Sequence, residues 1–319
     1  MAPTRATRTR RAKPVHTPIY FNPRQVPNSP FISFQKLPAF IEGSRRATIE
    51  VPPFGPREFR LAHFPDYVRG ILNLTLTNGF GTVSRAINDA MGYSAASLWA
   101  ACDHVLRGGG IACAAAQGFH HAGYNFNGGF CTINGLVIAA RKALAVVPRV
   151  LIIDGDAHYG DGTADCITAL NLADRVIHIT REDGIGDAQA GYTQADWQRY
   201  TADLLETHRP GLVIYQAGAD AWIDDPFDFG YLTFEAMAWR DSGIFDACLK
   251  ANVPVAWDLA GGYSEPMDMT VSLHLQTLRC SDLALRKHVR RQRRAELRRA
   301  ERRLADRRRA EQRHAAGAR

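Results

Sequence analysis

Five short apolar runs recur between residues 110 and 259, separated by longer stretches of helical character. They are too short for helices and lack the alternation of half-exposed strands, so both faces of each should be covered. Strands of this kind belong to a parallel sheet with crossover helices. The predicted fold class is therefore α/β: a single three-layer domain with a central parallel sheet flanked by helices. The predicted strands are Gly110–Ala115, Arg149–Asp154, Val176–Thr180, Leu212–Gln216 and Val253–Leu259, and the predicted helices are 94–107, 134–146, 196–208 and 232–250.

The net charge of +7 is unevenly distributed along the chain. Residues 286–319 hold 15 Lys or Arg and 4 acids, and residues 1–20 hold five bases and no acid, which leaves −9 for residues 21–285. We expect a disordered basic arm at 1–20, a folded domain at 21–285 and an Arg-rich helix or tail at 286–319. The acidic body is compatible with a cationic substrate, and the tail with nucleic acid or an acidic partner. A solvated helix without a partner explains the tail equally well.

Residues 21–60, rich in Pro and Phe, are expected to wrap the domain surface.

Composition disfavours several classes of protein. No apolar run approaches the roughly 18 residues of a membrane-spanning helix. The basic N-terminal segment lacks the apolar core of a secretory signal. The six cysteines are scattered without a CxxC pair, which favours reduced thiols over disulfides or a cysteine zinc site. We therefore expect a cytoplasmic protein, nuclear if eukaryotic, that is neither secreted nor membrane-bound.

Acidic and histidine side chains directly follow the predicted strand Arg149–Asp154, in the string DGDAHYGDG. Residues two apart on an extended chain point the same way, so Asp154, Asp156 and His158 should face one side. Asp161 lies just beyond and could support them. Because α/β proteins bind ligands at the carboxyl ends of their strands, this string predicts part of a divalent-metal site.

The predicted strand Leu212–Gln216 ends similarly and leads through Gly218 to Asp220. Small residues let backbone approach a site closely, so Asp220 can supply a third ligand. One histidine and two carboxylates with open coordination positions suit catalytic zinc or ferrous iron, whereas an all-oxygen set would suggest magnesium.

Two further segments carry groups suited to acid–base chemistry. His120 and His121 follow the predicted strand Gly110–Ala115 by a short loop. Adjacent side chains point apart, so these two are poor joint ligands and better placed as separate acid/base groups, each oriented by its own carboxylate. Tyr263 follows a flexible Gly-Gly, from which its hydroxyl could reach a cleft.

Together these segments resemble the zinc-dependent histone deacetylase family, which has the arginase/deacetylase fold. The family shows a GGFHHA-like string, then GFCxxN, DxDxHHGDG, GAD and GGY, and this chain has a counterpart of each in the same order. A further segment, LAHFPDYVRGIL with His63 and Tyr67, is similar to a helix of the family. The resemblance covers about residues 20 to 280. The counterparts are Gly118–Ala122, Gly129–Asn134, Asp154–Gly162, Gly218–Asp220 and Gly261–Tyr263.

The resemblance implies roles for the matched residues. Tyr263 would hydrogen-bond the substrate carbonyl, and Phe130, with Gly129 beside it, matches the aromatic wall of the family's acyl-lysine tunnel. The metal would be zinc, with ferrous iron as the alternative, and a structural potassium ion near Asp154 is a further family feature. The implied metal ligands are Asp156, His158 and Asp220, and the implied acid/base pair is His120 and His121, oriented by Asp154 and Asp161 respectively.

The family's activity would make this chain a metal-dependent deacetylase that removes acetyl, or another short acyl group, from acylated lysine in a peptide or protein. An acetylpolyamine amidohydrolase would share every catalytic residue. A manganese ureohydrolase of the arginase type needs a second carboxylate cluster, and Asp224 and Asp225 lack its DxD spacing. The alternative of another class is an inactive scaffold that binds through its basic tails.

The chain departs from the family pattern at three places. LAGGY stands in place of a longer glycine run, which should change the mobility of Tyr263. Tyr159 replaces the second histidine of HHG, which is not a ligand position, so we expect intact ligation. Asp89 is the only acid in residues 78–91, the region where the family's rim acid for a peptide backbone would lie.

Overall fold

The computed structural model describes residues 15–181, 184–227 and 229–317, and its centre is a six-stranded sheet in the order β1-β2-β6-β5-β3-β4. All neighbouring strands pair in parallel. The predicted single α/β domain with a parallel sheet is therefore confirmed. The strands are β1 (Ile19–Tyr20), β2 (Ile111–Ala114), β3 (Val150–Asp154), β4 (Val176–Ile179), β5 (Leu212–Gln216) and β6 (Val255–Asp258).

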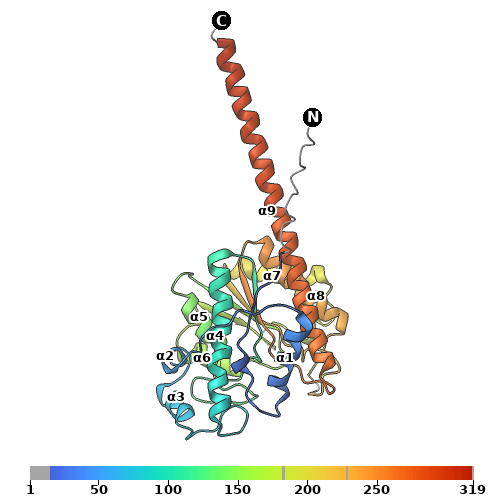
Figure 1. Ribbon diagram of the computed structural model, residues 1–319. Helices are drawn as coiled ribbons and strands as arrows, with labels where there is room; N and C mark the ends of the chain where they lie inside the picture. Colours follow the sequence, from blue (N-terminus) through green and yellow to red (C-terminus); the bar gives the residue numbers. More distant parts are fainter. Residues whose placement is uncertain (1–14, 182–183, 228, 318–319) are drawn as a thin grey trace, which may run out of the picture.

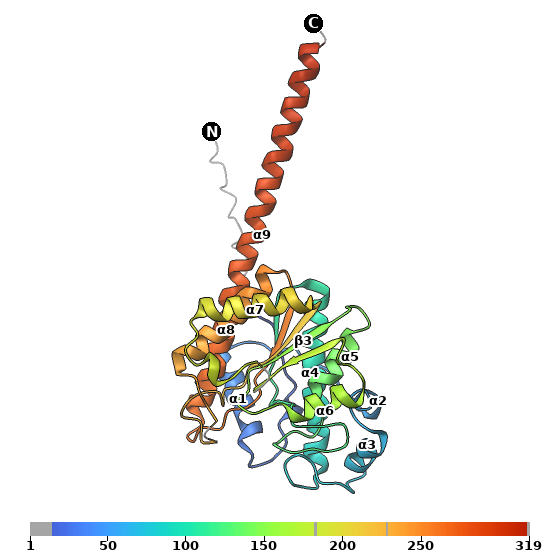
Figure 2. The same ribbon diagram turned by 180° about the vertical axis from the view of Figure 1, so that it is seen from behind.

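Helices cover both faces of this sheet, as Figures 1 and 2 show from opposite sides. One face carries α4, α5 and α6 with the short helices α2 and α3, and the other carries α1, α7, α8 and the first part of α9. The helices are α1 (Ile32–Ser44), α2 (Pro56–Phe59), α3 (Pro65–Leu72), α4 (Arg85–Gly108), α5 (Gly135–Ala143), α6 (Asp161–Ala169), α7 (Gln194–His208), α8 (Phe234–Lys250) and α9 (Asp268–Gly317), with single 3-10 turns at Pro23–Gln25 and Asp187–Gln189.

Alternation along β3 explains why the sheet needs cover on both sides. Val150 and Ile152 pack into the core beneath α4 and α5, whereas Leu151 and Ile153 pack into the core beneath α7 and α8. All four are buried, since successive side chains of a strand point to opposite faces. The unbroken apolar runs of the sequence follow from this double burial.

The N-terminal part of the chain differs from the sequence-based expectation. Strand β1 pairs with β2 at the sheet edge, so the folded domain begins before residue 21 and the arm expected at 1–20 is too long. Residues 1–14 lie outside the described residues. The segment 21–60 also does more than wrap the surface, because Phe34, Leu37 and Phe40 of α1 are fully buried. Helix α1 was not predicted, because it contains Pro38 and proline usually interrupts helices.

Helix α4 begins at Arg85 rather than at residue 94. Ser84 caps it by accepting a hydrogen bond from the Ile87 amide. Gly92 permits a close approach within the helix: a Cβ there would lie 2.6 Å from the carbonyl oxygen of Phe54. Glycine is a poor helix former, so this packing requirement could not be read from sequence propensity.

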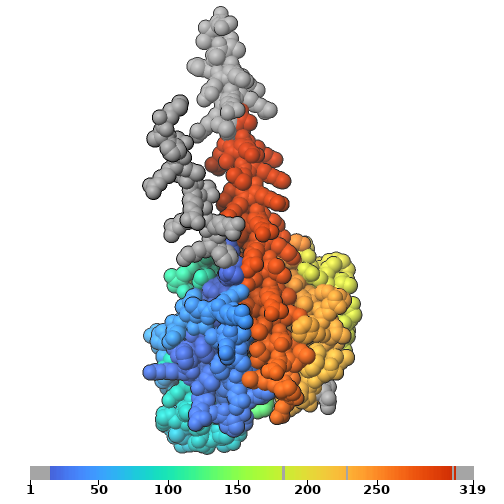
Figure 3. Space-filling model, turned by 45° about the vertical axis from the view of Figure 1, so that its right-hand side comes forward, coloured from blue at the N-terminus to red at the C-terminus, as the bar shows by residue number. Residues whose placement is uncertain are grey.

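Helix α9 joins the domain and the Arg-rich segment without a break. Figure 3 shows its first part lying along the body, and Figure 1 shows its last part projecting away from it. The body holds α9 as far as His288, which is buried. Arg286 Nε donates to the Val15 carbonyl, and Lys287 Nζ bonds Asp246 Oδ2 at 3.1 Å. From Gln292 to Arg303 every residue is exposed. Within the described residues no helix is both long and apolar enough to cross a bilayer.

Candidate active site

The carboxyl ends of the neighbouring strands β3, β5 and β6 lie side by side at the same end of the sheet. Asp154, Gln216 and Asp258 end these strands in matching register, and Gln216 Nε2 donates to Asp154 Oδ1 at 2.9 Å. The loops that follow carry the predicted site residues Asp156, His158, Asp220 and Tyr263. Parallel strands thus bring together motifs that are far apart in the sequence.

Asp156, His158 and Asp220 form one cluster. One potential ligand atom from each lies within 4.8 Å of the others. His158 Nδ1 lies 3.0 Å from Asp156 Oδ1 and 3.0 Å from Asp220 Oδ2. Both carboxylates are buried, whereas His158 is partly exposed, so the cluster is reached from the side of the imidazole.

The charges of this cluster fit a cation. Burial and the neighbouring Asp156 raise the pKa of Asp220 to about 7. Burial lowers the pKa of His158, but its hydrogen bonds to the two carboxylates outweigh burial and raise that pKa to about 10. Adjacent buried carboxylates repel each other unless a proton or cation lies between them. Since two carboxylates and one imidazole are also donors that zinc and ferrous iron accept, the residues present fit a divalent metal ion.

His120 lies between two carboxylates behind this cluster. Its Nδ1 is 2.8 Å from Asp154 Oδ2, and its Nε2 is 3.6 Å from Asp156 Oδ1. Burial lowers the pKa of His120, but Asp154 and Asp156 outweigh burial and raise it to about 9. The expected pairing of His120 with its own carboxylate is therefore present in the structure.

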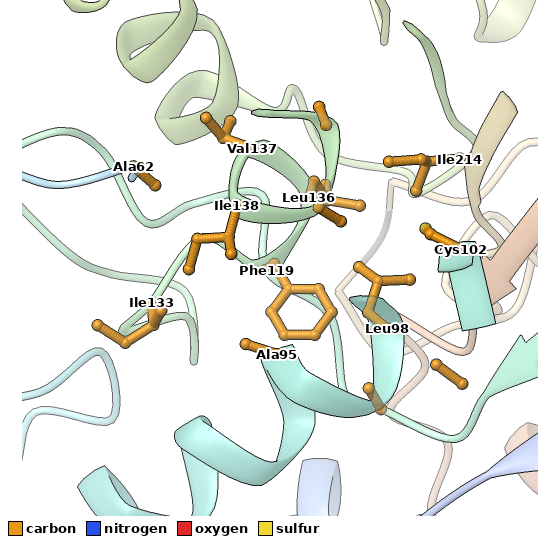
Figure 4. Close-up of a cluster of buried hydrophobic side chains, with 14 of the residues drawn as sticks. Ala62, Ala95, Leu98, Cys102, Phe119, Ile133, Leu136, Val137, Ile138 and Ile214 are labelled. Carbon is orange, nitrogen blue, oxygen red and sulfur yellow. The ribbon is translucent and has the colours of Figure 1, made fainter. Parts of the chain in front are cut away.

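Phe119 fixes the position of the tandem histidines. Figure 4 shows its ring packed against Ala95 and Leu98 of α4 and Leu136 of α5. A Cβ at Gly135 would lie 2.7 Å from this ring, so the first residue of α5 must be small. The backbone just before His120 is thus anchored in the hydrophobic core.

His121 has its own carboxylate on the more exposed side of the site. Its Nδ1 lies 2.6 Å from Asp161 Oδ1, and Asp161 is the first residue of α6. Gly129 lies against this imidazole, since a Cβ there would be 2.3 Å from His121 Cδ2, and its φ of +50° favours glycine. The two histidines therefore differ in exposure although their rings are 4.0 Å apart.

Tyr263 lies in an aromatic wall beside the cluster. Its ring centroid is 5.6 Å from that of Phe130 and 4.6 Å from that of Phe227. Burial raises the pKa of the Tyr263 hydroxyl well above its usual range, and the charges of Asp156 and Asp220 raise it further. The hydroxyl therefore keeps its proton at neutral pH and can donate a hydrogen bond.

The loop before Tyr263 makes several hydrogen bonds, although its two glycines suggest a flexible segment in the sequence. The Gly261 amide donates to Asp156 Oδ2 at 3.0 Å, and its carbonyl accepts from the Ala219 amide at 3.0 Å. The Tyr263 amide donates to Asp225 Oδ2 at 2.9 Å. Glycine is needed here for space rather than for motion, because a Cβ at Gly261 would lie 2.3 Å from Asp220 Oδ2.

The Asp154 side chain is surrounded by protein donors, and the potassium ion that the family resemblance implies near it stays a prediction. Asp154 Oδ2 lies 2.8 Å from His120 Nδ1 and 3.3 Å from His178 Nε2. Its Oδ1 accepts from Gln216 Nε2 at 2.9 Å and from the Asp156 amide at 3.2 Å. Burial raises the pKa of Asp154, but the two histidines lower it to about 2. This carboxylate is ionised and fully engaged with protein donors.

A cavity of about 740 Å³ opens beside Tyr263, lined by Phe31, Phe130 and Phe227 among others. Glu265 is the one charged residue among those lining it in the described part of the chain. Asp89, the acid that the sequence offers for the rim, lies on α4 and lines a different cavity with Pro53 and Phe54. The carboxylate that lines this cavity was therefore not predicted.

The acids Asp224 and Asp225 form no second metal cluster within the described residues. Asp224 is exposed, and Asp225 accepts hydrogen bonds from the amides of Tyr263 and Phe227. The second carboxylate cluster that a manganese ureohydrolase requires is thus not formed by these two.

Sequence reasoning missed three cationic or titratable residues around the site. Lys36 of α1 is fully buried and its Nζ donates to the Ala260 carbonyl, while burial lowers its pKa to about 8 against the pull of Asp220. Arg240 of α8 is also fully buried. The Nε2 atom of His178, on β4, lies 3.3 Å from Asp154 Oδ2. The apolar string FQKLPAF around Lys36 indicates that this lysine is buried. The sequence around Arg240 and His178 gives no comparable indication that they lie near the site.

Comparisons with known proteins agree with this geometry. Residues 33–180 match the histone deacetylase domain family. An uncharacterized protein of Picosynechococcus sp. is 31% identical over 242 residues, covering 67% of this chain and 78% of that protein. The chain belongs to the histone deacetylase-like family. Histone deacetylase 2 of Arabidopsis thaliana is 26% identical over 182 residues, and that match covers 50% of this chain and only 46% of the plant protein.

Solved structures agree on the fold of this deacetylase-like chain. An acetylpolyamine aminohydrolase from Burkholderia pseudomallei superposes with a TM-score of 0.65 at 19% identity, covering 84% of this chain and 99% of that one. The HDA15 HD domain superposes with a TM-score of 0.66 at 18% identity, covering 84% and 94%. The arginase/deacetylase-like architecture expected from the motifs is confirmed.

His63 supports the tandem-histidine loop from below. Its Nδ1 lies 2.7 Å from the Gly123 carbonyl oxygen, and its Nε2 accepts from the Asn134 amide at 2.8 Å. Because Nε2 is an acceptor, the buried imidazole must be neutral. Burial accordingly lowers the pKa of His63 to about 4.

This burial predicts a pH-dependent loss of stability. The unfolded chain takes up a proton at His63 near pH 6.5 and the folded chain only near pH 4, so stability falls as pH drops through that window. We expect the free energy of unfolding to decrease by about 3 kcal/mol from this group. His63→Gln keeps a donor and an acceptor but does not titrate. Urea unfolding of both proteins at pH 7 and pH 4 checks this, and equal pH dependence of the two would contradict it.

Proposed function

We propose that this chain is a metal-dependent amide hydrolase that removes acetyl, or another short acyl group, from acylated lysine. The observation that carries the proposal is the convergence of the Asp156–His158–Asp220 cluster with two carboxylate-bound histidines. Its membership of the histone deacetylase-like amidohydrolase family supports the same reaction class. We place the activity in the cytoplasm, or in the nucleus of a eukaryote, because all six cysteines are free and buried.

Asp156, His158 and Asp220 would hold zinc or ferrous iron. A bound ion of this kind lowers the pKa of water and polarises an amide carbonyl. The two carboxylates would offset the ion's charge, and an acyl group could reach the cluster from the side of His158, which is partly exposed.

His120 and His121 would move the protons of the reaction at their Nε2 atoms. The Nδ1 atom of each is hydrogen-bonded to a carboxylate, which leaves Nε2 for exchange with water or substrate. The Nε2 of His120 also faces Asp156 Oδ1, at 3.6 Å. Asp154 and Asp156 favour the protonated form of His120, which suits donation to the leaving amine. His121, more exposed, is the better candidate to accept a proton from water.

Tyr263 would donate its hydroxyl proton in a hydrogen bond to the substrate carbonyl oxygen. That bond strengthens as negative charge develops on the oxygen, which is how such donors accelerate acyl transfer. Phe130 and Phe227 beside it would pack against the aliphatic part of the substrate.

A second candidate substrate is an acetylated polyamine. Glu265 is the one charge among the described residues that line the cavity next to Tyr263, and it could attract a cationic amine. The acidic body of residues 21–285 favours the same kind of ligand.

The first test is metal dependence on a substrate panel. We expect chelated protein to be inactive on acetyl-lysine peptides, acetylated polyamines and longer acyl-lysines. About one equivalent of zinc or iron should restore activity on at least one of them. Asp220→Asn should lose the metal, whereas Asp224→Asn, an exposed neighbour, should retain it. Full activity of metal-free protein would exclude the mechanism, and a metal-loaded chain that cleaves no amide would favour the scaffold alternative.

The second test concerns Tyr263. Tyr263→Phe should lower kcat by about 10²- to 10³-fold and leave bound metal unchanged, because it removes one donor to the developing oxyanion. Tyr231→Phe makes the same chemical change at a buried tyrosine packed near Arg181. That control should retain kcat. A Tyr263→Phe enzyme with normal kcat would remove this residue from the mechanism.

The projecting end of α9 supports a further proposal, binding of nucleic acid. Arg291, Arg294, Arg298 and Arg302 follow one another at spacings of three and four residues, and they line one stretch of the helix surface. Such spacings place side chains on one helix face. A row of exposed guanidinium groups fits the regular phosphates of a duplex.

Truncation tests this role of the helix. A chain lacking residues 293–319 should lose salt-sensitive retention on DNA or RNA while hydrolysing small substrates normally. The cut falls beyond Arg286 and Lys287, which contact the body, so folding should be unaffected. In the full chain, Arg294→Gln with Arg298→Gln should weaken retention more than the matched pair Arg293→Gln with Arg303→Gln. Retention that survives truncation would make the segment a solvated helix only.

A further inference from the structure

Arg240 is a charged side chain that the mechanism above does not use. It lies on α8 with no exposed surface, behind the loops that carry the proposed metal ligands. Burying a guanidinium group is costly unless its donors are satisfied. The partners of Arg240 therefore show what the group does.

The guanidinium joins two separate loops through their backbone carbonyls. Nη1 donates to the Gly155 carbonyl at 2.7 Å, and Nη2 donates to the Gly218 carbonyl at 3.1 Å. Gly155 directly precedes Asp156, and Gly218 lies two residues before Asp220. One side chain thus holds the backbone of both loops that supply carboxylates to the cluster.

The orientation of the guanidinium group, whose three nitrogens form a planar fork of donors, is fixed by a second buried network. Arg240 Nε donates to Asp241 Oδ1 at 3.0 Å, and the same oxygen accepts from the Tyr215 hydroxyl at 2.6 Å. Asp241 Oδ2 accepts from Thr277 Oγ1 at 2.6 Å. Asp241 is in this way tied to β5 and α9, which leaves Arg240 little freedom to rotate.

The glycines at both contacts allow this close assembly. A Cβ at Gly155 would lie 3.1 Å from the Tyr215 ring and 3.3 Å from Arg240 Nη1. A Cβ at Gly218 would lie 2.5 Å from the Asp156 Cα and 2.6 Å from Asp220 Oδ1. The two loops are packed directly on each other, with the guanidinium behind them.

We infer that Arg240 is a positioning residue that sets the separation of Asp156 and Asp220, and with it the affinity of the metal site. This inference rests on the proposed metal-dependent function. Three donors in a rigid plane reach three acceptors on different elements, which an ammonium group on a flexible stem cannot reproduce. Side chains that orient metal ligands from behind contribute about 10- to 100-fold to metal affinity.

The test compares metal affinity across matched variants of the full chain. Arg240→Lys keeps the charge but loses the fork, and we expect its dissociation constant for zinc or cobalt to rise about 10- to 100-fold. The visible absorption of the cobalt-loaded protein should change as well, because the ligand geometry relaxes. Tyr215→Phe is the control, since it removes one hydrogen bond from the same buried network without touching either carbonyl. It should lower Tm but leave the dissociation constant and spectrum unchanged.

The outcomes separate this inference from the proposed function. If the unmodified chain binds no metal, the proposed site itself is wrong. If it binds metal and Arg240→Lys and Tyr215→Phe weaken binding equally, or neither does, Arg240 has no positioning role. Should Arg240→Lys fail to fold, Asp241→Asn decides, because it keeps the arginine but removes the negative charge that orients its guanidinium group. An intermediate loss of affinity there supports the inference, and unchanged affinity overturns it.

Discussion

Buried negative charge at the carboxyl edge of the sheet is the constraint on which the rest of the site depends. Asp154, Asp156 and Asp220 lie within a few residues of the ends of β3 and β5, where water is excluded. Ionised carboxylates in such a place require cations or donors close by. The structure supplies His120 and His158 and, among the described residues, leaves the Asp156–His158–Asp220 cluster as a fitting place for a divalent ion.

Much of the remaining architecture keeps these groups in position. Phe119 anchors the tandem histidines in the core, and His63 supports the loop that follows them. Asp225 holds the Tyr263 backbone, and Arg240 joins the two carboxylate loops. Active sites need such support, because a displacement of about 1 Å costs much of their rate. The loop before Tyr263, whose two glycines suggest flexibility in the sequence, is tied to Asp156, Ala219 and Asp225 by hydrogen bonds.

The body and the projecting helix are physically separate parts of one chain. The site lies in the acidic body, and α9 projects away from that body (Figures 1 and 3). The Arg side chains of α9 between residues 291 and 303 are exposed. This charge distribution is compatible with the proposed cationic substrate at the body and the proposed polyanionic partner at the helix. Helix α9 runs through residue 286 without a break. While this helix is intact, it would hold a partner bound to its projecting end at a fixed distance from the sheet.

The sequence by itself determined the parallel sheet, because doubly buried strands leave unbroken apolar runs such as Leu212–Gln216. It also indicated the site residues, since acids and histidines placed after such runs have few purely structural explanations. Only the tertiary structure decided what lies behind them. Arg240, His178 and Lys36 reach the site across long sequence separations, and no local pattern encodes a contact between α8 and the ends of two strands. The periodicity of the sequence indicates which face of a helix or strand a residue lies on. The residue that it contacts on that face depends on how the helices pack on the sheet.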